Sequence, residues 1–320
     1  MSREDVRDNG VLAGALADLQ REVRGRLDEG SAAVSAQLSS EELFELFDRL
    51  RRVAGTFGME ERSGEVDEFG LDSVVCDRTR PLLEFLAARW WRVEVEGLAD
   101  VPRDGPVLYV ANRSGLLPWD GLMLAHKLEA WHPQGERPRF LVADWLVTLP
   151  FAQPTLARLG GVRACRENAE RLLRSGRSVV AFPEGVKGAA KLFADRYRLQ
   201  RFGRGGVVKL AIECGVPLVP VSVVGAEEAH PVLVKVEMLT RSLGLPFVPV
   251  TPTFPWLGPL GALPLPAKWA IRFGTPLELD AFGPEAAADE ILISRQTEEL
   301  RGRIQRMVDT DRRARRGVFS

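Results

Sequence analysis

The sequence has few of the residues that indicate a disulfide-rich, metal-binding or nucleic-acid-binding protein. Its 320 residues include three cysteines, Cys76, Cys165 and Cys214, which lie too far apart for a disulfide framework or a Cys-rich zinc site. The 43 basic and 44 acidic side chains give a net charge of −1, whereas a nucleic-acid binder normally has a strong basic excess. We therefore expect a protein of a reducing, cytoplasmic setting that binds no nucleic acid and needs no metal.

The sequence also lacks a stretch that can form a transmembrane helix. The N-terminal MSREDVRDNG is charged, whereas a signal peptide has an apolar core. The longest uncharged stretch, 242–267, has 26 residues, but seven prolines and three glycines interrupt it and prevent a continuous helix. Two interpretations stay open: a proline-rich loop folded over the protein's own core, or an apolar surface that enters a membrane interface. Four aromatic residues in or beside the stretch favour the second: Phe247, Phe254, Trp256 and Trp269.

Short apolar stretches alternate with helical patterns over most of the chain. The expected strands are 91–96, 107–111, 139–143, 178–182, 218–224 and 270–273. The expected helices are 81–91, 120–131, 145–159, 168–173, 205–214 and 284–309. Strands of about five residues separated by helices are typical of a layered α/β domain.

Helical patterns also precede this domain. The sequence Ser39-Ser40-Glu41-Glu42 is a capping box, and apolar residues follow it at helical spacing up to Val53. We therefore expect three parts: a helical extension and linker over 1–65, the α/β domain over 66–300, and a basic C-terminal tail over 301–320.

Four segments carry most of the polar and glycine-rich residues that stand out from this pattern. They are VANRSGLLPWD at 110–120, GGVRACREN at 160–168, VVAFPEGVKG at 179–188 and VPLVPVSVVG at 216–225. In this order and spacing they resemble the four sequence blocks of the glycerolipid acyltransferases, which include the glycerol-3-phosphate and lysophosphatidate acyltransferases. Phe-Pro-Glu-Gly is the most specific of these motifs. The resemblance covers about residues 92–280, and the first segment is most similar to the branch of monoacylglycerol-type and bacterial glycerol acyltransferases.

The resemblance implies an acyltransferase-type α/β fold and an activity in lipid synthesis. Members transfer an acyl group from acyl-CoA or acyl-carrier protein to a hydroxyl of a glycerol-based (lyso)phospholipid or glycerolipid, without a bound cofactor. In their first block a His deprotonates the acceptor hydroxyl and an Asp orients that His. Their second-block Arg and third-block Glu-Gly bind the acceptor's phosphate or glycerol.

These roles transfer to the matching positions of this sequence. Asp120 takes the place of the orienting carboxylate, and Arg166, Glu184 and Gly185 take the places of the binding residues. The remaining substrate-binding residues that we predict in the first and third segments are Ser114, Gly115 and Lys187.

The sequence departs from the family pattern at the position of the base, which is Arg113. A guanidinium with a pKa above about 12 cannot take a proton at neutral pH, so Arg113 cannot be the general base. We expect it to form an ion pair with Asp120. The three histidines are poor replacements: His126 lies about 240° around its predicted helix from Asp120, His132 ends that helix, and His230 follows the fourth segment.

Three accounts of the missing His remain open. Asp120 acts as a weak base while Arg113 binds a phosphate or the developing oxyanion; or activity is lost and lipid or acyl-carrier binding is kept; or a remote residue completes the site. We therefore predict an acyltransferase, with a non-catalytic lipid-binding protein of the same fold as the alternative.

Two segments are locally basic despite the balanced total. Between Glu184 and Lys209 there are seven basic and two acidic residues, which indicates either a phosphate site or a solvated basic face. From Arg301 onwards there are seven arginines against Asp309 and Asp311. This tail either attracts an anionic membrane surface or is a disordered solubilising segment. We expect a protein that is peripheral to the inner membrane face.

Overall fold

The computed structural model describes residues 66–115, 117–132, 135–147, 152–236, 248–252, 263–279, 282–315 and 317. The predicted helical extension and linker, 1–65, lie outside the described residues, as does most of the proline-rich stretch.

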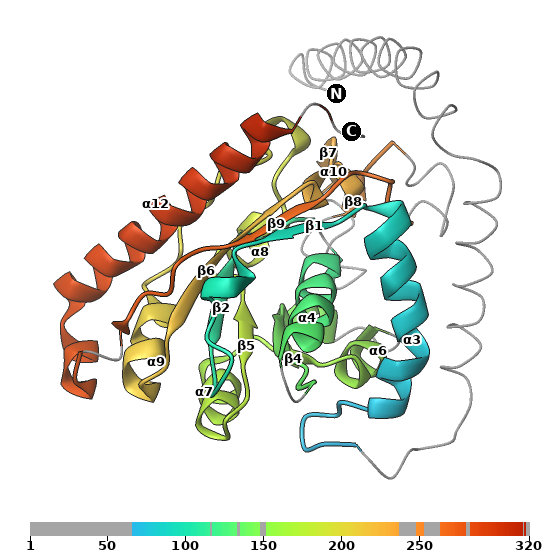
Figure 1. Ribbon diagram of the computed structural model, residues 1–320. Helices are drawn as coiled ribbons and strands as arrows, with labels where there is room; N and C mark the ends of the chain where they lie inside the picture. Colours follow the sequence, from blue (N-terminus) through green and yellow to red (C-terminus); the bar gives the residue numbers. More distant parts are fainter. Residues whose placement is uncertain are drawn as a thin grey trace, which may run out of the picture. The chain divides into compact units, whose positions relative to one another are not determined.

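A seven-stranded sheet in the order β1-β9-β6-β2-β5-β3-β4 forms the centre of the fold (Figure 1). Five neighbouring strands run parallel: β6 (Leu218–Val224), β2 (Leu108–Ala111), β5 (Val179–Ala181), β3 (Arg139–Val142) and β4 (Gly161–Arg163). Strand β9 (Ala270–Phe273) pairs antiparallel with β6, and β1 (Glu94–Glu96) pairs parallel with β9. A separate antiparallel pair consists of β7 (Val234–Val236) and β8 (Val248–Val250).

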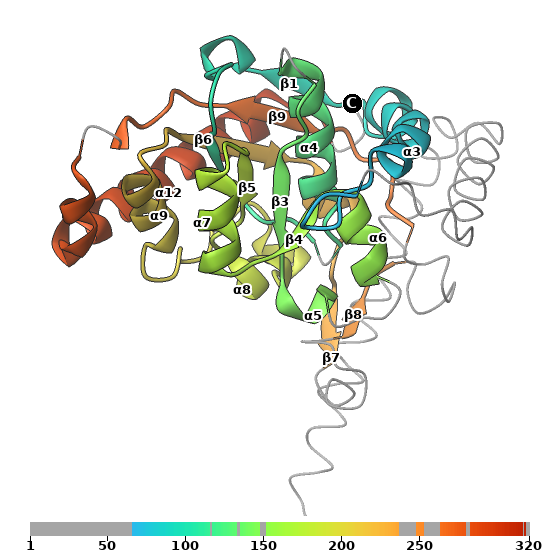
Figure 2. The ribbon, with the colours of Figure 1, turned by 90° about the horizontal axis from the view of Figure 1, so that it is seen from below.

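The strand sequences explain why helices cover both faces of this sheet. Every residue of β2, β5 and β6 is buried, which is typical of parallel strands with helices on both sides. Helix α12 (Glu290–Ala314) packs against β6 on one face, while α4 (Trp119–Trp131) and α7 (Arg166–Arg174) pack on the other (Figures 1 and 2). Helix α9 (Gly206–Cys214) contacts both α7 and α12. The predicted layered α/β architecture is confirmed.

The remaining described helices are short, apart from α3. They are α3 (Ser73–Phe85), η1 (Leu86–Trp90), η2 (Leu98–Asp100), α5 (Asp144–Val147), α6 (Ala152–Arg158), α8 (Gly185–Ala189), η3 (Phe193–Asp195), α10 (Ala226–Ala229) and η6 (Pro284–Ala288). Helix α3 begins eight residues before the predicted start at 81, because the Asp72 side chain accepts hydrogen bonds from the N–H groups of Val74 and Val75. Of the helix expected over 145–159, the structure describes α5 and α6, and the residues between them lie outside the described part.

The predicted start of a separate tail at residue 301 is wrong. Helix α12 runs through that position, and its residues Leu300, Ile304 and Val308 are fully buried. Near its end, the Asp311 carboxylate accepts hydrogen bonds from Ser222 Oγ and Arg272 Nε, both at 2.7 Å. Up to Arg315, therefore, the basic C-terminal segment is an ordered part of the α/β domain. Its arginines lie between buried apolar positions with helical spacing.

The assignment of Trp269 to a membrane-facing surface is also wrong. Its side chain is fully buried, and its ring stacks on that of Trp91 with the centroids 4.2 Å apart. The other aromatic residues of that prediction, Phe247, Phe254 and Trp256, lie outside the described residues. No helix in the described part of the chain is both long enough and apolar enough to cross a membrane.

Candidate functional site

The four segments meet at one edge of the sheet. Strands β2, β4, β5 and β6 run parallel, so the residues that follow them, 112–120, 164–168, 182–188 and Gly225, leave the sheet at the same carboxyl edge. Ligands of open α/β sheets bind at this edge. The fold therefore gathers residues that are more than 100 positions apart in the sequence.

Arg113 and Asp120 form the expected ion pair. Arg113 Nη1 lies 2.5 Å from Asp120 Oδ1, and both side chains are buried. The Asp120 carboxylate also accepts hydrogen bonds from the N–H of Ser114 at 2.9 Å, its Oγ at 3.3 Å and the N–H of Gly121 at 2.8 Å. Burial raises the pKa of the Asp120 carboxyl, and Arg113 and these donors oppose that rise. Because its oxygens are already bonded and fully buried, Asp120 has no accessible face toward an acceptor hydroxyl.

Glu184 joins the first and third segments. Its Oε1 accepts a hydrogen bond from the backbone N–H of Arg113 at 2.8 Å, and its Oε2 accepts one from the N–H of Gln200 at 2.7 Å. The side chain is fully buried. The structure thus directs the Glu184 carboxylate at the protein backbone, whereas the sequence analysis expected it to contact the acceptor.

A buried cation completes this arrangement. Lys191 Nζ lies 3.4 Å from Glu184 Oε2 and 2.7 Å from Glu227 Oε1. Burial lowers the pKa of Lys191, but the two carboxylates more than offset this and hold it above its ordinary value. Glu227 also accepts a hydrogen bond from the N–H of Tyr197 at 3.0 Å. We call Arg113, Asp120, Glu184, Lys191 and Glu227 the inner cluster.

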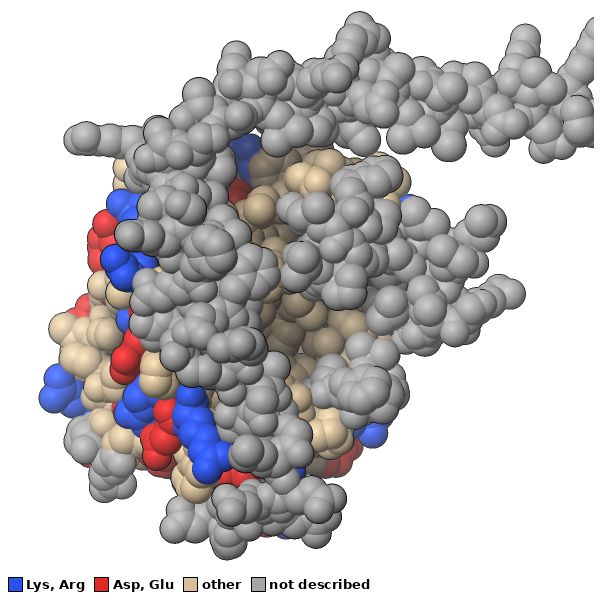
Figure 3. Space-filling model, turned by 90° about the vertical axis from the view of Figure 1, so that its right-hand side faces the viewer, with Lys and Arg blue, Asp and Glu red and all other residues tan. Residues whose placement is uncertain are grey.

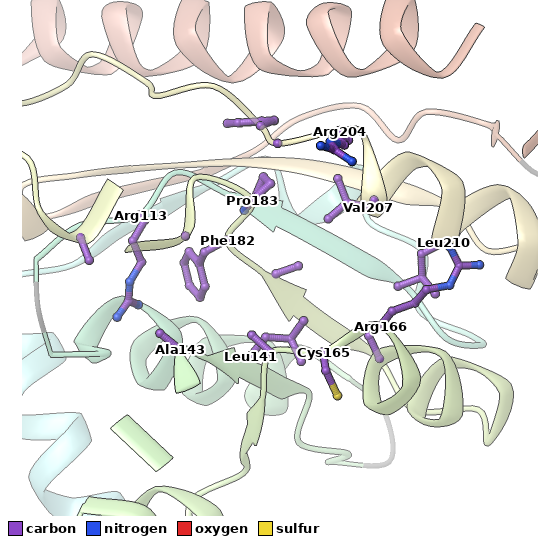
Figure 4. Close-up of a pocket in the computed structure, with 18 of the residues that line it drawn as sticks. Arg113, Leu141, Ala143, Cys165, Arg166, Phe182, Pro183, Arg204, Val207 and Leu210 are labelled. Carbon is purple, nitrogen blue, oxygen red and sulfur yellow. The ribbon is translucent and has the colours of Figure 1, made fainter. Parts of the chain in front are cut away.

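A cavity of about 300 Å³ lies beside the inner cluster (Figure 4). Arg113 is at one end, where its guanidinium carbon lies 5.0 Å from the centre of the Phe182 ring. Arg204 lies near Val207 and Arg166 near Leu210, toward the other end (Figure 4). Its remaining walls are mostly apolar: Leu141, Ala143, Trp145, Ala164, Cys165, Ala169, Ala181, Phe182, Pro183, Gly185, Ala189, Phe202, Gly203, Gly206, Val207 and Leu210. Apolar walls between cationic ends match a ligand that has a hydrocarbon chain and an anionic group.

The two arginines at the outer end have different surroundings. Arg166 is half-exposed, begins α7 and pairs with Glu213 of α9. Arg204 is exposed just before α9 and has no carboxylate partner among the residues that the structure describes. Both helices have nine residues, and their N-termini carry partial positive charge. This end of the cavity can hold an anion.

The other predicted binding residues are only partly gathered here. Gly185 lines the cavity with a φ of +58°, a conformation that favours glycine. The backbone N–H and the hydroxyl of Ser114 both donate hydrogen bonds to Asp120. Gly115 lies beside His230, whose Cβ would be 3.8 Å from a Cβ at Gly115. Lys187 is exposed on α8 and does not line the cavity.

None of the three histidines, all of which the structure describes, is among the residues that line the cavity. His126 is buried in α4, where burial and nearby cations lower its pKa to about 4. His132 Nε2 lies 3.3 Å from the hydroxyl of Tyr109. Of the cavity's described lining residues, only the three arginines and Cys165 are titratable. In the described part of the chain, no group of histidine, cysteine and acidic residues is arranged to hold a metal ion.

The sequence analysis missed the residues that hold the segments together. The Asn112 amide donates to the carbonyl of Val223 at 2.9 Å and accepts from its N–H at 2.7 Å, which ties the end of β2 to β6. Lys191 and Glu227 were not expected to pair. A polar residue directly after a buried strand is a signal that could have singled out Asn112. The sequence around Lys191 and Glu227 contains no signal that the two residues are buried as a pair.

Comparisons with known proteins agree with the sequence blocks. The family model Acyltransferase matches residues 92–224. Uncharacterized proteins of Mycobacterium tuberculosis and Mycobacterium leprae are both 42% identical, over 298 and 280 residues. These alignments cover 92% and 87% of this chain and 83% and 76% of the relatives.

More distant matches have assigned names. A human protein named DGAT1/2-independent enzyme synthesizing storage lipids is 25% identical over 237 residues, which is 73% of this chain and 66% of that protein. The crystal structure of the 1-acyl-sn-glycerophosphate acyltransferase from Thermotoga maritima matches with a TM-score of 0.47 and 19% identity, over 86% of this chain and 90% of that one. The family model and the human relative match the part of the chain that holds the four segments, and this protein belongs to the glycerolipid acyltransferase superfamily.

Proposed function

We propose that the protein transfers an acyl group from a thioester donor, acyl-CoA or acyl-carrier protein, to a hydroxyl of a glycerolipid. The observation that carries this proposal is the apolar cavity that ends at Arg113, between the first and third segments. An acyl chain in this cavity would have its carbonyl beside a buried, fixed guanidinium. Two features support the proposal: the cavity's apolar walls, and the family to which the chain belongs.

In this reaction the acceptor oxygen attacks the thioester carbonyl, and the bond between carbon and sulfur breaks. The hydroxyl gives up one proton and the departing thiolate takes up one, so the overall reaction balances without a cofactor. The Arg113 N–H groups are donors that can stabilise the negative charge on the carbonyl oxygen. The Asp120 carboxylate fixes the orientation of this guanidinium.

We propose that the acceptor carries a phosphate, as in a lysophospholipid. Arg166 and Arg204 at the outer end of the cavity, each at a helix N-terminus, support this assignment. Arginine matches a phosphate with two parallel hydrogen bonds, which lysine cannot reproduce.

One observation favours the second candidate, a non-catalytic lipid-binding protein. Among the described residues that line the cavity, none replaces the family's histidine as a proton acceptor at neutral pH. A protein that retained the cavity but lost the base would bind an acyl chain without transferring it.

Incubation with labelled acyl-CoA and a panel of lysolipids separates the two candidates. We expect slow transfer by the native protein, and an increase of about 10²-fold or more for Arg113→His, the usual contribution of a general base. Arg163→His is the matched control, because Arg163 is exposed, pairs with Asp144 and is not among the residues that line the cavity. No transfer by either protein, with lipid binding intact, supports the binding protein instead.

The acceptor assignment has its own test. Binding of a lysophosphatidate is compared with that of the uncharged monoacylglycerol. Arg166→Lys should weaken lysophosphatidate binding nearly as much as Arg166→Ala, by about 10- to 100-fold, because hydrogen bonds to charged groups contribute about 1.5–3 kcal/mol. Lys187→Ala, outside the cavity, should cost far less. If the native protein does not prefer the phosphorylated lipid, the acceptor is neutral.

We further propose that the protein works at the surface of the inner membrane without spanning it. It should co-sediment with anionic liposomes and be released in part by high salt, which screens only the electrostatic contribution. Binding that depends neither on lipid composition nor on Trp256→Ser contradicts this proposal.

A further inference from the structure

Lys191 is a buried lysine to which the proposed reaction assigns no role. Its side chain is 4% exposed, and its ammonium group lies 3.4 Å from the Glu184 carboxylate and 2.7 Å from that of Glu227. In the part of the chain that the structure describes, no other cation is paired with either carboxylate. Among these residues, two buried negative charges therefore share one positive charge.

Charges on the outside of the protein have a different environment. On the face shown in Figure 3, lysine and arginine side chains lie next to acidic ones at the surface, where water screens them. The Lys191 ammonium is removed from water, and such a charge is costly unless it is paired and hydrogen-bonded. The contacts of its two carboxylate partners show which parts of the fold this charge holds in place.

Glu184 connects the charge of Lys191 to Arg113. Its Oε1 accepts a hydrogen bond from the backbone N–H of Arg113 at 2.8 Å, and its Oε2 accepts one from the N–H of Gln200 at 2.7 Å. An ionised carboxylate accepts at both oxygens, whereas a protonated one turns one oxygen into an O–H donor. The positive charge of Lys191 favours the ionised form and so preserves both bonds.

Arg113 is thus held at two points. Glu184 fixes its backbone, and Asp120 fixes its guanidinium. The guanidinium lies at one end of the cavity, beside Phe182 (Figure 4). A group that stabilises charge in a transition state must already be in place, to within about 0.5 Å, before the reaction begins. Loss of the backbone anchor should therefore slow transfer more than it weakens binding of the acyl chain.

Glu227 extends this arrangement to the fourth segment. Its carboxylate accepts a hydrogen bond from the N–H of Tyr197 at 3.0 Å. Tyr197 has a φ of +68°, which is uncommon for an aromatic residue and persists only where its surroundings hold it. The Tyr197 hydroxyl accepts a hydrogen bond from the N–H of Gly225, just after β6, at 3.1 Å. The two carboxylates on Lys191 therefore link the first, third and fourth segments.

We propose that Lys191, together with Glu227, is a positioning residue for acyl transfer: it keeps Glu184 in the form that fixes the backbone of Arg113, and so holds the Arg113 guanidinium at the thioester carbonyl. The proposal rests on the proposed function, in which Arg113 stabilises the charge on that carbonyl oxygen. Lys191 and Glu227 are not among the residues that line the cavity, so they act through Glu184 and not on the substrate.

Two variants and a control separate the charge of Lys191 from its volume. Lys191→Met keeps an unbranched side chain and leaves Glu184 and Glu227 without their shared cation. Lys191→Met/Glu227→Gln also removes one of the two carboxylates, so the net charge of the group returns to its native value. Lys268→Met is the matched control, because Lys268 pairs with Glu94, outside the inner cluster, at 2.9 Å.

Four measurements are made on each protein. Transfer from palmitoyl-CoA to a lysolipid gives kcat and KM, and binding of a non-hydrolysable palmitoyl-CoA thioether reports on the cavity. Thermal denaturation reports on folding. Hydrogen exchange at the backbone amide of Arg113, followed by NMR, reports on its bond to Glu184 and requires no catalytic activity.

We expect Lys191→Met to lower kcat by about tenfold or more, with KM and thioether binding unchanged, and to accelerate exchange at the Arg113 amide. The double variant should recover most of the kcat and of the amide protection, because Glu184 then keeps its two N–H donors without a like charge beside it. The control should behave as the native protein.

Two outcomes would overturn the proposal. One is a parallel loss of kcat and thioether binding in Lys191→Met, which would show that Lys191 only supports packing. The other is a double variant that folds but recovers neither kcat nor protection of the Arg113 amide. If Lys191→Met does not fold, the double variant decides: native kcat and amide protection support the proposal, and their loss overturns it.

Failure of the proposed function has a different signature. If the native protein transfers no acyl group, but exchange at the Arg113 amide accelerates in Lys191→Met and is restored in the double variant, the positioning of Arg113 stands and the transfer reaction is wrong. If the native protein transfers and Lys191→Met matches it in kcat and in amide exchange, the reaction stands and the positioning role is wrong.

Discussion

The buried inner cluster and the exposed cations that lie close to it in the sequence show two ways in which one protein holds its charges. In the inner cluster every side chain has an oppositely charged partner, and Asp120 and Glu184 are fully buried. Four exposed cations begin only a few residues away in the sequence and have no such partner among the described residues. We call this set the basic strip: Lys187, Arg198, Arg201 and Arg204.

Desolvation explains the difference. A buried charge is costly unless it is paired and hydrogen-bonded, so the cluster must be complete for the loops to fold. An exposed charge stays hydrated and needs no partner for stability, so the strip remains available to a ligand. We therefore expect variants of the cluster to affect folding and variants of the strip to affect binding.

The largest expected effect comes from breaking the central pair of the cluster. Asp120→Ala leaves Arg113 buried without its carboxylate, which should lower the free energy of unfolding by about 3–5 kcal/mol. Chemical denaturation measures this change. Asp144→Ala is the control, because its pair with Arg163 is exposed to solvent and should contribute little to stability. Equal losses in the free energy of unfolding for Asp120→Ala and Asp144→Ala would contradict the difference between a buried and an exposed ion pair.

A second effect is expected from His126, a buried titratable group that has no carboxylate partner in the described part of the chain and should respond to pH. His126 has a pKa of about 4 in the folded protein, because burial and then the nearby cations Lys127, Arg137 and Arg80 disfavour its protonated form; its ordinary value is 6.5. As the pH falls below 6.5, the unfolded chain takes up a proton and the folded protein does not. Stability is therefore fully present above 6.5 and declines until about pH 4, by roughly 2–4 kcal/mol.

Denaturation of native protein and His126→Gln across this pH range tests the expectation. The native protein should lose more stability between pH 7 and pH 4 than the variant, which has no group to titrate at this position. Identical pH dependence would show that His126 is protonated equally in the folded and unfolded chains.

A smaller effect is expected where the cluster is tightly packed. A Cβ at Gly188 would lie 2.5 Å from the Cβ of Glu184 and 2.8 Å from that of Arg113. Gly188→Ala should therefore cost about 1–3 kcal/mol through strain in the two loops. At Gly206, the first residue of α9, a Cβ would meet no atom within 4 Å. Gly206→Ala should leave stability unchanged or slightly raise it, and thermal denaturation compares the two.

The smallest effect on stability belongs to the strip. Lys187→Ala and Arg201→Ala should change the free energy of unfolding by no more than about 0.5 kcal/mol, because neither side chain is buried or paired. Removing one of several like charges can raise the free energy of unfolding by reducing repulsion, and any such increase should disappear at high salt. A loss comparable to that of Gly188→Ala would show that the strip is structural.

Local sequence predicted the scaffold well because its signals are local. The buried runs of β2 and β6, and the apolar sequences of α4 and α9, predicted the α/β layers, and the four segments predicted the place of the site. The prediction failed where the signal was weak or ambiguous. Strand β4 has only the three residues Gly-Val-Arg. The helix of α12 was expected as far as residue 309, but its arginine-rich second half was assigned to a separate tail from residue 301.

The sequence by itself determined that Arg113 is not a base, because the guanidinium's intrinsic pKa holds in any fold. It also predicted the Arg113–Asp120 pair, whose members are seven residues apart. Only the tertiary structure decided which other charges are buried together. The contact between Glu184 and the backbone of Arg113 spans 71 positions, and Lys191 meets Glu227 across 36. Residue type and spacing fix what a side chain can do, whereas its partners and its desolvation depend on which strands the fold places side by side.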